Sequence, residues 1–161
     1  YDYKYVGTRV AMIERLFEVV DLERNTFKLI HSELIQQVQC VEFNLKRIYA
    51  AMCQGDFDDN FHSLDNANLG KIVRELKRLD HSDGCPELTD MNYKTIDEIR
   101  MIRNYWCHQC YLDFAYIQND SERERAFQRI AERLHYDEFR TYELMQKTQA
   151  IYTYIMDKYR R

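Results

Sequence analysis

The chain has 161 residues, of which 45% are hydrophobic and 31% are charged, and its formal net charge is −4. This length and apolar content are typical of one domain, residues 1–161, with a core that needs neither disulfides nor metals. Four glycines and one proline exclude a collagen-like chain and disfavour a turn-rich β-architecture, and the apolar content excludes intrinsic disorder. The acidic balance argues against a general nucleic-acid coat protein, so any contact with RNA must be local.

No apolar run approaches the roughly 18–20 residues that a membrane span needs, and the first residues do not resemble a signal peptide. The chain begins at Tyr1 without an initiator Met, which leaves open an upstream segment. Its cysteines are odd in number and scattered, as expected for reduced thiols in a cytoplasmic protein rather than for a disulfide framework. They are Cys40, Cys53, Cys85, Cys107 and Cys110.

The first predicted element is helical and long, because residues 8–54 contain neither Gly nor Pro. Apolar residues recur there at steps of three and four, the helical period. They are Phe27, Ile30, Leu34, Val38, Val41, Leu45, Ile48 and Met52, preceded by a similar stripe of Ile13, Leu16, Phe17 and Val20. Two possibilities stay open, one helix or two separated near Asn25-Thr26. Turn-forming residues 55–60 then end the element.

Three further helices are predicted. The second begins at Asn66 or Asn68 as the N-cap and ends at Leu79, before a strong break at residues 81–86. The third begins after Thr89-Asp90 and continues to about Ile117. The fourth begins at Ser121, which has capping-box spacing to Glu124, and continues to the end of the chain with a possible bend at residues 135–137. The prediction is an all-α bundle of four to five helices.

The third predicted helix carries a line of polar residues through an otherwise apolar sequence. Spacings of three, four, four and three put them on one face, with Arg103 beside it. The line consists of Asp97, Arg100, Asn104, His108 and Tyr111. Burying such groups costs free energy unless they are paired or used. Two interpretations stay open, a polar seam satisfied by neighbouring helices or solvent, and a functional face.

The segment Arg103-Asn104-Tyr105-Trp106-Cys107-His108 has the pattern R-N-x3-H, late in a long helix of an all-α domain. In this it resembles the HEPN superfamily (higher eukaryotes and prokaryotes nucleotide-binding domain), whose layout residues 41–46 and 69–72 also fit. The resemblance implies a homodimeric, metal-independent endoribonuclease without a cofactor, of the kind found among toxins and antiviral effectors. It implies Arg103, Asn104 and His108 as the catalytic residues. The helical spacing adds Asp97, Arg100 and Tyr111 as a supporting polar face.

The chemistry of these residue types agrees with that activity. Cleavage without metal uses the ribose 2′-OH as nucleophile, and histidine suits the base and acid roles because its ordinary pKa lies near neutrality. An arginine fork stabilises the charge on phosphate. Arg103 and His108 are about 140° apart around a helix and about 7.5 Å apart along it. One straight helix is therefore not expected to bring both to one point, and two copies across a two-fold axis would form a composite site.

The resemblance also implies a cognate antitoxin or nucleotidyltransferase as a partner. Many toxins that are paired with a nucleotidyltransferase carry R-x4-H-x-Tyr, and the partner modifies this Tyr with AMP. Here Cys110 occupies that position and Tyr111 follows one residue later. Because one residue turns a helical side chain by about 100°, the sequence does not predict this modification.

The thiols raise a second possibility for the same segment. Cys107 and Cys110 have C-x-x-C spacing and, with Cys85 and His81, make up a four-ligand set for zinc. The pair lies within a helix, without the turn of a zinc ribbon, and we therefore predict no metal.

Two basic stripes have helical spacing. They are Lys71, Arg74 and Arg78 in the second helix and Arg125, Arg129 and Arg133 in the fourth. Either stripe can hold an RNA backbone, and either can be a solvated surface, since glutamates lie among both. The first is the candidate RNA-binding surface.

Two hypotheses about function follow from the sequence. The first is an RNA-cleaving effector that uses Arg103 and His108, assisted by Asn104. The second is a catalytically inactive HEPN-like module that dimerises or binds a nucleotide or a protein, with the polar line as its specificity seam.

Overall fold

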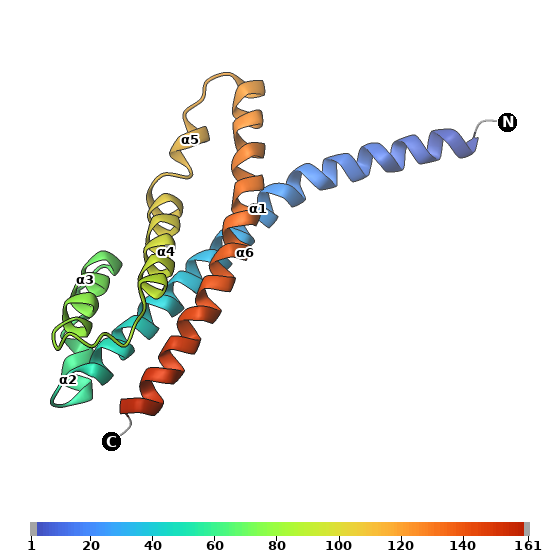
Figure 1. The fold of residues 1–161 in the computed structure, drawn as a ribbon. Coiled ribbons are helices and arrows are strands. Elements are labelled where there is room, and N and C mark those ends of the chain that lie inside the picture. The colour runs from blue at the N-terminus through green and yellow to red at the C-terminus, as the bar shows by residue number, and fades with distance from the viewer. Residues whose placement is uncertain (1–2, 160–161) are drawn as a thin grey trace.

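The computed structural model describes the backbone of residues 3–159 and the side chains of residues 24–159. This part of the chain contains helices and no strand, which confirms the all-α prediction (Figure 1). Two short helices, α2 and α5, bring the number above the four to five predicted. The helices are α1 (Tyr3–Met52), α2 (Phe57–His62), α3 (Leu69–Asp80), α4 (Asp90–His108), α5 (Leu112–Ala115) and α6 (Asp120–Tyr159). None of the helices in the described part is long and apolar enough to cross a membrane.

Helix α1 is the central element, with α6 packed along it and α3 and α4 resting against it (Figure 1). It is one continuous helix through Asn25-Thr26, which decides the question that the sequence left open. The predicted apolar stripe is buried at Phe27, Leu34, Val38, Val41, Leu45 and Ile48. The stripe predicted over residues 13–20 lies outside the residues whose side chains are described.

Local capping fixes where α3 and α4 begin. The Asn68 side chain accepts the N–H of Lys71 at 2.9 Å, so Asn68 is the N-cap of α3, as one of the two alternatives predicted. Thr89 forms a reciprocal capping box with Asn92 at the start of α4. These caps satisfy helical N–H groups that have no partner within the helix.

Helix α6 begins one residue earlier than predicted. Asn119 Oδ1 accepts a hydrogen bond from the N–H of Glu122 at 2.9 Å, and the backbone carbonyl of Asn119 accepts one from the N–H of Arg123. Asn119 therefore caps the helix, and the prediction that Ser121 does so is wrong. The helix continues without interruption through residues 135–137.

Helix α4 ends at His108, nine residues before the predicted end at Ile117. The N–H groups of Gln109 and Cys110 both donate to the carbonyl of Tyr105, at 2.8 and 3.1 Å, which closes the last turn. The chain then turns into α5, where Phe114 is buried against Phe127. Burial of this aromatic side chain favours the turn over a longer helix.

The residues predicted as a turn after α1 include the short helix α2. The Asp56 carboxylate accepts the N–H groups of Asp58 and Asp59 at 2.9 and 3.0 Å, which caps α2. Gly55 has a φ of +98°, a conformation that favours glycine, and it separates α1 from this cap.

Candidate functional site

Arg103 and His108 are in direct contact within one chain. Arg103 Nη1 lies 3.1 Å from His108 Nε2 and 3.3 Å from Asn104 Oδ1. The expectation that one helix cannot bring Arg103 and His108 together is therefore wrong. The long arginine side chain spans the turn between them, and His108 is the last residue of α4, where the chain opens. The three residues of the R-N-x3-H pattern form one cluster.

The contact has one possible direction as a hydrogen bond. A guanidinium has donors and no acceptor, so Arg103 Nη1 is the donor and His108 Nε2 the acceptor. The His108 side chain is exposed, and 26% of the Arg103 side chain is exposed. A neutral imidazole that solvent reaches is able to accept a proton from a bound molecule.

Glu42 of α1 completes the cluster. Its Oε1 lies 3.6 Å from Arg103 Nε, and 26% of its side chain is exposed. Sequence reasoning included Glu42 only in the layout of the first helix and gave it no role. The available signal was an acidic residue at the border of a buried stripe, directly after Val41. Its charge draws the arginine against α1 and orients the fork toward His108.

The cluster opens into a cleft of about 630 Å³ between α4 and the start of α3. The α3 residues at this cleft were not predicted as site residues. The cleft, here called the Arg–His cleft, is lined by Asn68, Leu69, Gly70, Arg100, Arg103, Asn104, Tyr105, His108 and Gln109.

The start of α3 contributes positive potential to this cleft. The first N–H groups of a helix lack intrahelical partners and carry partial positive charge. The first turn of α3 contains no acidic residue to balance that charge, and Lys71 adds to it. Together with Arg100 and Arg103, this helix end favours an anion such as a phosphate.

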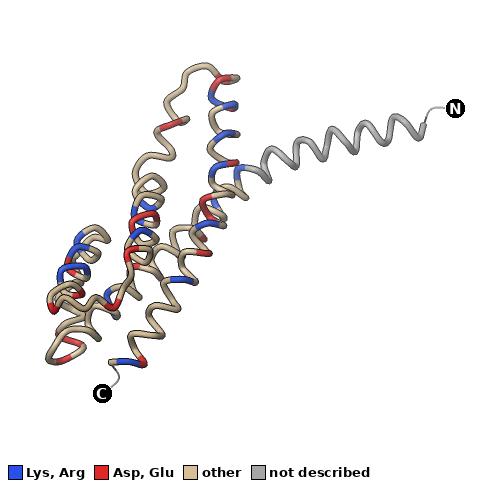
Figure 2. The backbone as a smooth tube through the Cα atoms, viewed as in Figure 1, with Lys and Arg blue, Asp and Glu red and all other residues tan. Residues whose placement is uncertain are grey.

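A second cleft of about 710 Å³ continues from the first between α3 and α4. It contains all three residues of the predicted RNA-binding stripe, and Figure 2 shows the basic residues gathered along α3. We call it the α3–α4 groove. Its lining residues are Asn68, Gly70, Lys71, Val73, Arg74, Lys77, Arg78, His81, Asp97 and Arg100.

The predicted polar face is divided in the structure. Arg100 pairs with Asp97, with Arg100 Nη2 2.7 Å from Asp97 Oδ1, and both line the groove. Tyr111 lies beyond the end of α4, so its predicted place on the same face is wrong. Its ring packs on those of Phe27 and His31, with centroids 6.1 and 5.7 Å away. Burial there raises the pKa of Tyr111.

A bracket of hydrogen bonds holds the turn that follows His108. Tyr105 donates its hydroxyl to Asp113 Oδ2 at 2.7 Å, and Gln109 donates its amide to Oδ1 at 2.8 Å. The bonds from Gln109 and then Tyr105 lower the pKa of Asp113. Burial and the bond to Asp113 raise the pKa of Tyr105 to about 12. The bracket ties α5 to the last turn of α4 and so fixes the backbone that carries His108.

The cysteines do not assemble with His81. Cys107 is exposed, whereas Cys110 is buried and donates its thiol to the carbonyl of Trp106 at 3.2 Å. Cys85 is exposed in the loop after α3. Among residues 24–159 no group of three or more His, Cys, Asp or Glu side chains is placed to hold a metal ion.

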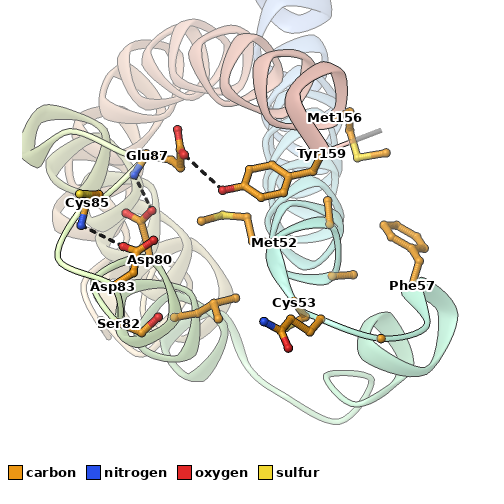
Figure 3. A pocket seen from close by; sticks show the side chains of 15 residues that line it. Met52, Cys53, Phe57, Asp80, Ser82, Asp83, Cys85, Glu87, Met156 and Tyr159 are labelled. Atoms are coloured by element: carbon orange, nitrogen blue, oxygen red, sulfur yellow. Dashed lines mark hydrogen bonds between the residues drawn. The ribbon is translucent and has the colours of Figure 1, made fainter. Parts of the chain in front are cut away.

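Another cavity, of about 630 Å³, lies where α1, α3 and α6 end (Figure 3). Asp80 accepts the N–H groups of Glu87 and Leu88, at 2.7 and 3.2 Å, and the hydroxyl of Tyr93 at 2.8 Å. Glu87 in turn accepts bonds from Lys158, Tyr154 and Tyr159. Both acids therefore hold the loop against the bundle, and we assign this cavity no chemistry.

Two residues of the second basic stripe lie away from these clefts, and the third, Arg133, lies over the ring of Tyr105. Arg125 and Arg129 line a shallow depression with Ser121 and Glu124, and Arg133 is bound to Asp137 at 3.2 Å.

The Arg–His cleft thus combines one imidazole, two guanidinium groups and a positive helix end around a single space. This arrangement is able to bind an anion and to move a proton beside it. No protein-family model matches the chain, and comparison with curated proteins and with solved structures gives no match either.

Proposed function

We propose that the protein is a metal-independent endoribonuclease that cleaves RNA by attack of the ribose 2′-OH on the adjacent phosphate. The observation that carries the proposal is the 3.1 Å contact between Arg103 Nη1 and His108 Nε2 in an open cationic cleft. The R-N-x3-H pattern of the HEPN superfamily supports the same activity.

Each group has a defined part in the reaction. When a phosphate enters, Arg103 turns its fork toward the phosphate oxygens, and Nε2 of His108 becomes free to accept the 2′-OH proton. The 2′ oxygen then bonds to phosphorus, the bond from phosphorus to the 5′ oxygen breaks, and that oxygen takes a proton from the protonated imidazole of His108 in a second copy of the chain. The products are a 2′,3′-cyclic phosphate and a 5′-hydroxyl. Arg103 and the α3 helix end stabilise the charged transition state, and Asn104 keeps Arg103 in place.

A second copy of the chain supplies the second proton-transfer group in this proposal. Attack and departure need a base and an acid, and among the described residues at the cleft His108 alone has an imidazole. Met101 is 63% exposed, and it lies three and seven residues before Asn104 and His108 on the outward face of α4. An exposed apolar side chain on that face suits a two-fold contact that brings two His108 side chains to one phosphate.

RNA cleavage of this kind would arrest a cell, so we place the protein with cytoplasmic toxins or antiviral effectors. A cognate antitoxin or nucleotidyltransferase would then hold the activity in check. Coexpression with the product of a neighbouring gene, scored by restored growth, tests this partner.

The test of catalysis compares single substitutions on total RNA in EDTA. We expect His108→Ala and Arg103→Ala to lower the cleavage rate by about 10²–10⁴-fold, since each removes a proton-transfer or charge-stabilising group. His62→Ala is the matched control, because His62 is an exposed histidine on α2 that pairs with Asp65. Cleavage that persists in His108→Ala, or that requires Mg²⁺, would contradict the proposal.

The test of the dimer uses two exposed methionines of the same helix. We expect Met101→Glu to give a monomer in light scattering and to abolish cleavage. Met91→Glu is the control, since Met91 is 66% exposed at the other end of α4. An active monomeric Met101→Glu protein would refute the composite site.

The catalytically inactive module is the second candidate function. The pairing of Arg103 with Glu42 favours it, because a guanidinium that is already satisfied needs no substrate. A protein that dimerises but cleaves no RNA in EDTA would support this alternative.

A further inference from the structure

The α3–α4 groove and the Arg–His cleft are parts of one continuous surface. Asn68, Gly70 and Arg100 line both. A carbon added at Gly70 would lie 3.8 Å from Arg100 Cδ, so the Arg100 side chain lies beside the start of α3. The groove and the Arg–His cleft therefore adjoin at these three residues.

Two of the basic residues in the groove hold charge that no neighbour neutralises. In the described part of the chain, no carboxylate lies within 4.0 Å of Lys71 or Arg74. Arg78 and Arg100 each pair with one exposed or half-buried acid, and Lys77 lies over the ring of Tyr93 at 5.2 Å. The groove therefore keeps an excess of positive charge available to a polyanion.

The position of Lys71 is unfavourable for the helix itself. A cation in the first turn opposes the helix dipole, where an acidic residue would stabilise α3. A bound anion reverses that penalty, because it lies between Lys71 and the positive helix end. Residues that oppose a local preference of the helix, as Lys71 does, are expected at functional sites.

We propose that the α3–α4 groove binds the phosphates of single-stranded RNA next to the phosphate that is cleaved. The inference rests on the proposed function and adds to it that the substrate is an extended single strand. The groove follows the crease between two adjacent helices and is lined along one side by the α3 basic stripe, so we infer that it holds one strand. A duplex, whose accessible face is a wide and shallow minor groove, would rest on the rim.

The groove also sets a minimum length for the substrate. Lys71 to Arg78 spans seven residues, about 10.5 Å of helix. The stripe is therefore long enough to contact more than one phosphate of an extended strand. A dinucleotide fills only the Arg–His cleft, and we expect its cleavage to be at least 10-fold slower than cleavage of a longer strand.

The binding test uses the His108→Ala protein and a 12-nucleotide RNA, either single-stranded or annealed to its complement. Adding Lys71→Gln and Arg74→Gln should weaken single-strand binding at least 10-fold. It should also reduce the slope of log affinity against log salt by about 1.4, since each phosphate contact contributes about 0.7. Adding Arg125→Gln and Arg129→Gln instead removes the same charge from α6 and should change neither. The inference would be overturned if the α3 and α6 double substitutions lowered the affinity equally. It would also be overturned if the duplex bound as tightly as the single strand.

A second test blocks the junction without changing any charge. A Cβ at Gly70 meets only ordinary contacts, at 3.5 Å from Asn68 Oδ1 and 3.8 Å from Arg100 Cδ. Gly70→Ala should therefore keep the affinity within twofold, whereas Gly70→Leu fills the junction and should lower it more than fivefold. An unchanged affinity in Gly70→Leu would count against a strand passing this point.

The two proposals fail in different ways. If the wild-type protein cleaves dinucleotides and long strands equally, the proposed nuclease function stands and the proposed RNA-binding role of the groove is refuted. If the protein cleaves no RNA and still binds the single strand through Lys71 and Arg74, the RNA-binding role of the groove stands and the proposed nuclease function is refuted.

Discussion

The two basic stripes have the same helical spacing, yet they lie in different surroundings. On α3, Lys71 and Arg74 face an open groove that leads to His108. On α6, Arg133 lies 3.5 Å over the ring of Tyr105 and pairs with Asp137. Figure 2 shows both stripes as rows of basic residues. The difference teaches that spacing defines a helical face, whereas the elements packed beside that face decide whether its charge is free or used.

One residue of the α6 stripe, Arg133, therefore contributes to the packing of the fold. Asp137, which is buried, accepts the indole N–H of Trp106 at 2.8 Å and so joins Arg133 to the core. The depression formed by Arg125 and Arg129 shares no residue with the Arg–His cleft or the groove.

The largest effect on stability is expected at Asp137. Asp137→Ala leaves the buried indole N–H of Trp106 without its partner, which should lower the free energy of unfolding by about 2–3 kcal/mol. Urea denaturation measures this change. Glu132→Ala, at an exposed position of the same helix, should stay within about 0.5 kcal/mol. Unchanged stability in Asp137→Ala would remove the contrast between the stripes.

Matched arginine substitutions sharpen the comparison. Arg133→Gln removes the contact with the ring of Tyr105 and should cost about 1 kcal/mol of stability without affecting RNA binding. Arg74→Gln should do the reverse, weakening RNA binding while stability stays within about 0.5 kcal/mol. Melting curves and fluorescence anisotropy on the same two proteins measure both quantities. If the two substitutions behave alike, the stripes do not differ in the way described.

The pH dependence of stability tests the bracket beside His108. The pKa of Tyr105, about 12, lies above the ordinary value of about 10. The neutral phenol therefore stabilises the fold fully below pH 10, and this contribution is lost as the pH rises from 10 through 12. We expect Tyr105→Phe to remove one phenol that ionises near pH 12, measured by absorbance at 295 nm. Tyr116→Phe, at a ring that is 74% exposed, is the control and should leave that component in place.

The smallest effect is expected at the start of α3. Gly70→Ala reduces the conformational freedom of the unfolded chain and meets no close atom, so it should raise the free energy of unfolding by about 0.5 kcal/mol. Thermal unfolding monitored by circular dichroism measures it. A loss of stability would mean that the start of α3 lacks the space described.

The parts of the fold that local chemistry decides were predictable. The apolar stripe of α1 and the cap at Asn68, one of two alternatives predicted, depend on residues close in sequence, and the structure confirms them. The end of α4 was predicted wrongly because it depends on burial of Phe114 against α6 and on the bracket to Asp113. Neither interaction leaves a periodic pattern.

The candidate site was predictable in composition and not in geometry. The R-N-x3-H pattern pointed to Arg103 and His108, but a helical projection places backbones and takes no account of the reach of an arginine side chain. Glu42 and Gly70 come from helices that are separated from α4 by loops, and tertiary packing alone brings them there. Tyr111 was placed wrongly because the helix was assumed to continue past His108.

The two helices that form the α3–α4 groove pack on the same buried core. Ile72 and Leu76 of α3 and Ile96 and Ile99 of α4 are fully buried in the same core as α1. The distance between the walls is therefore set before any ligand arrives, and little conformational entropy of the backbone is lost on binding. If the proposed cleavage holds, such preorganisation would let the groove capture a flexible strand and release its fragments without refolding.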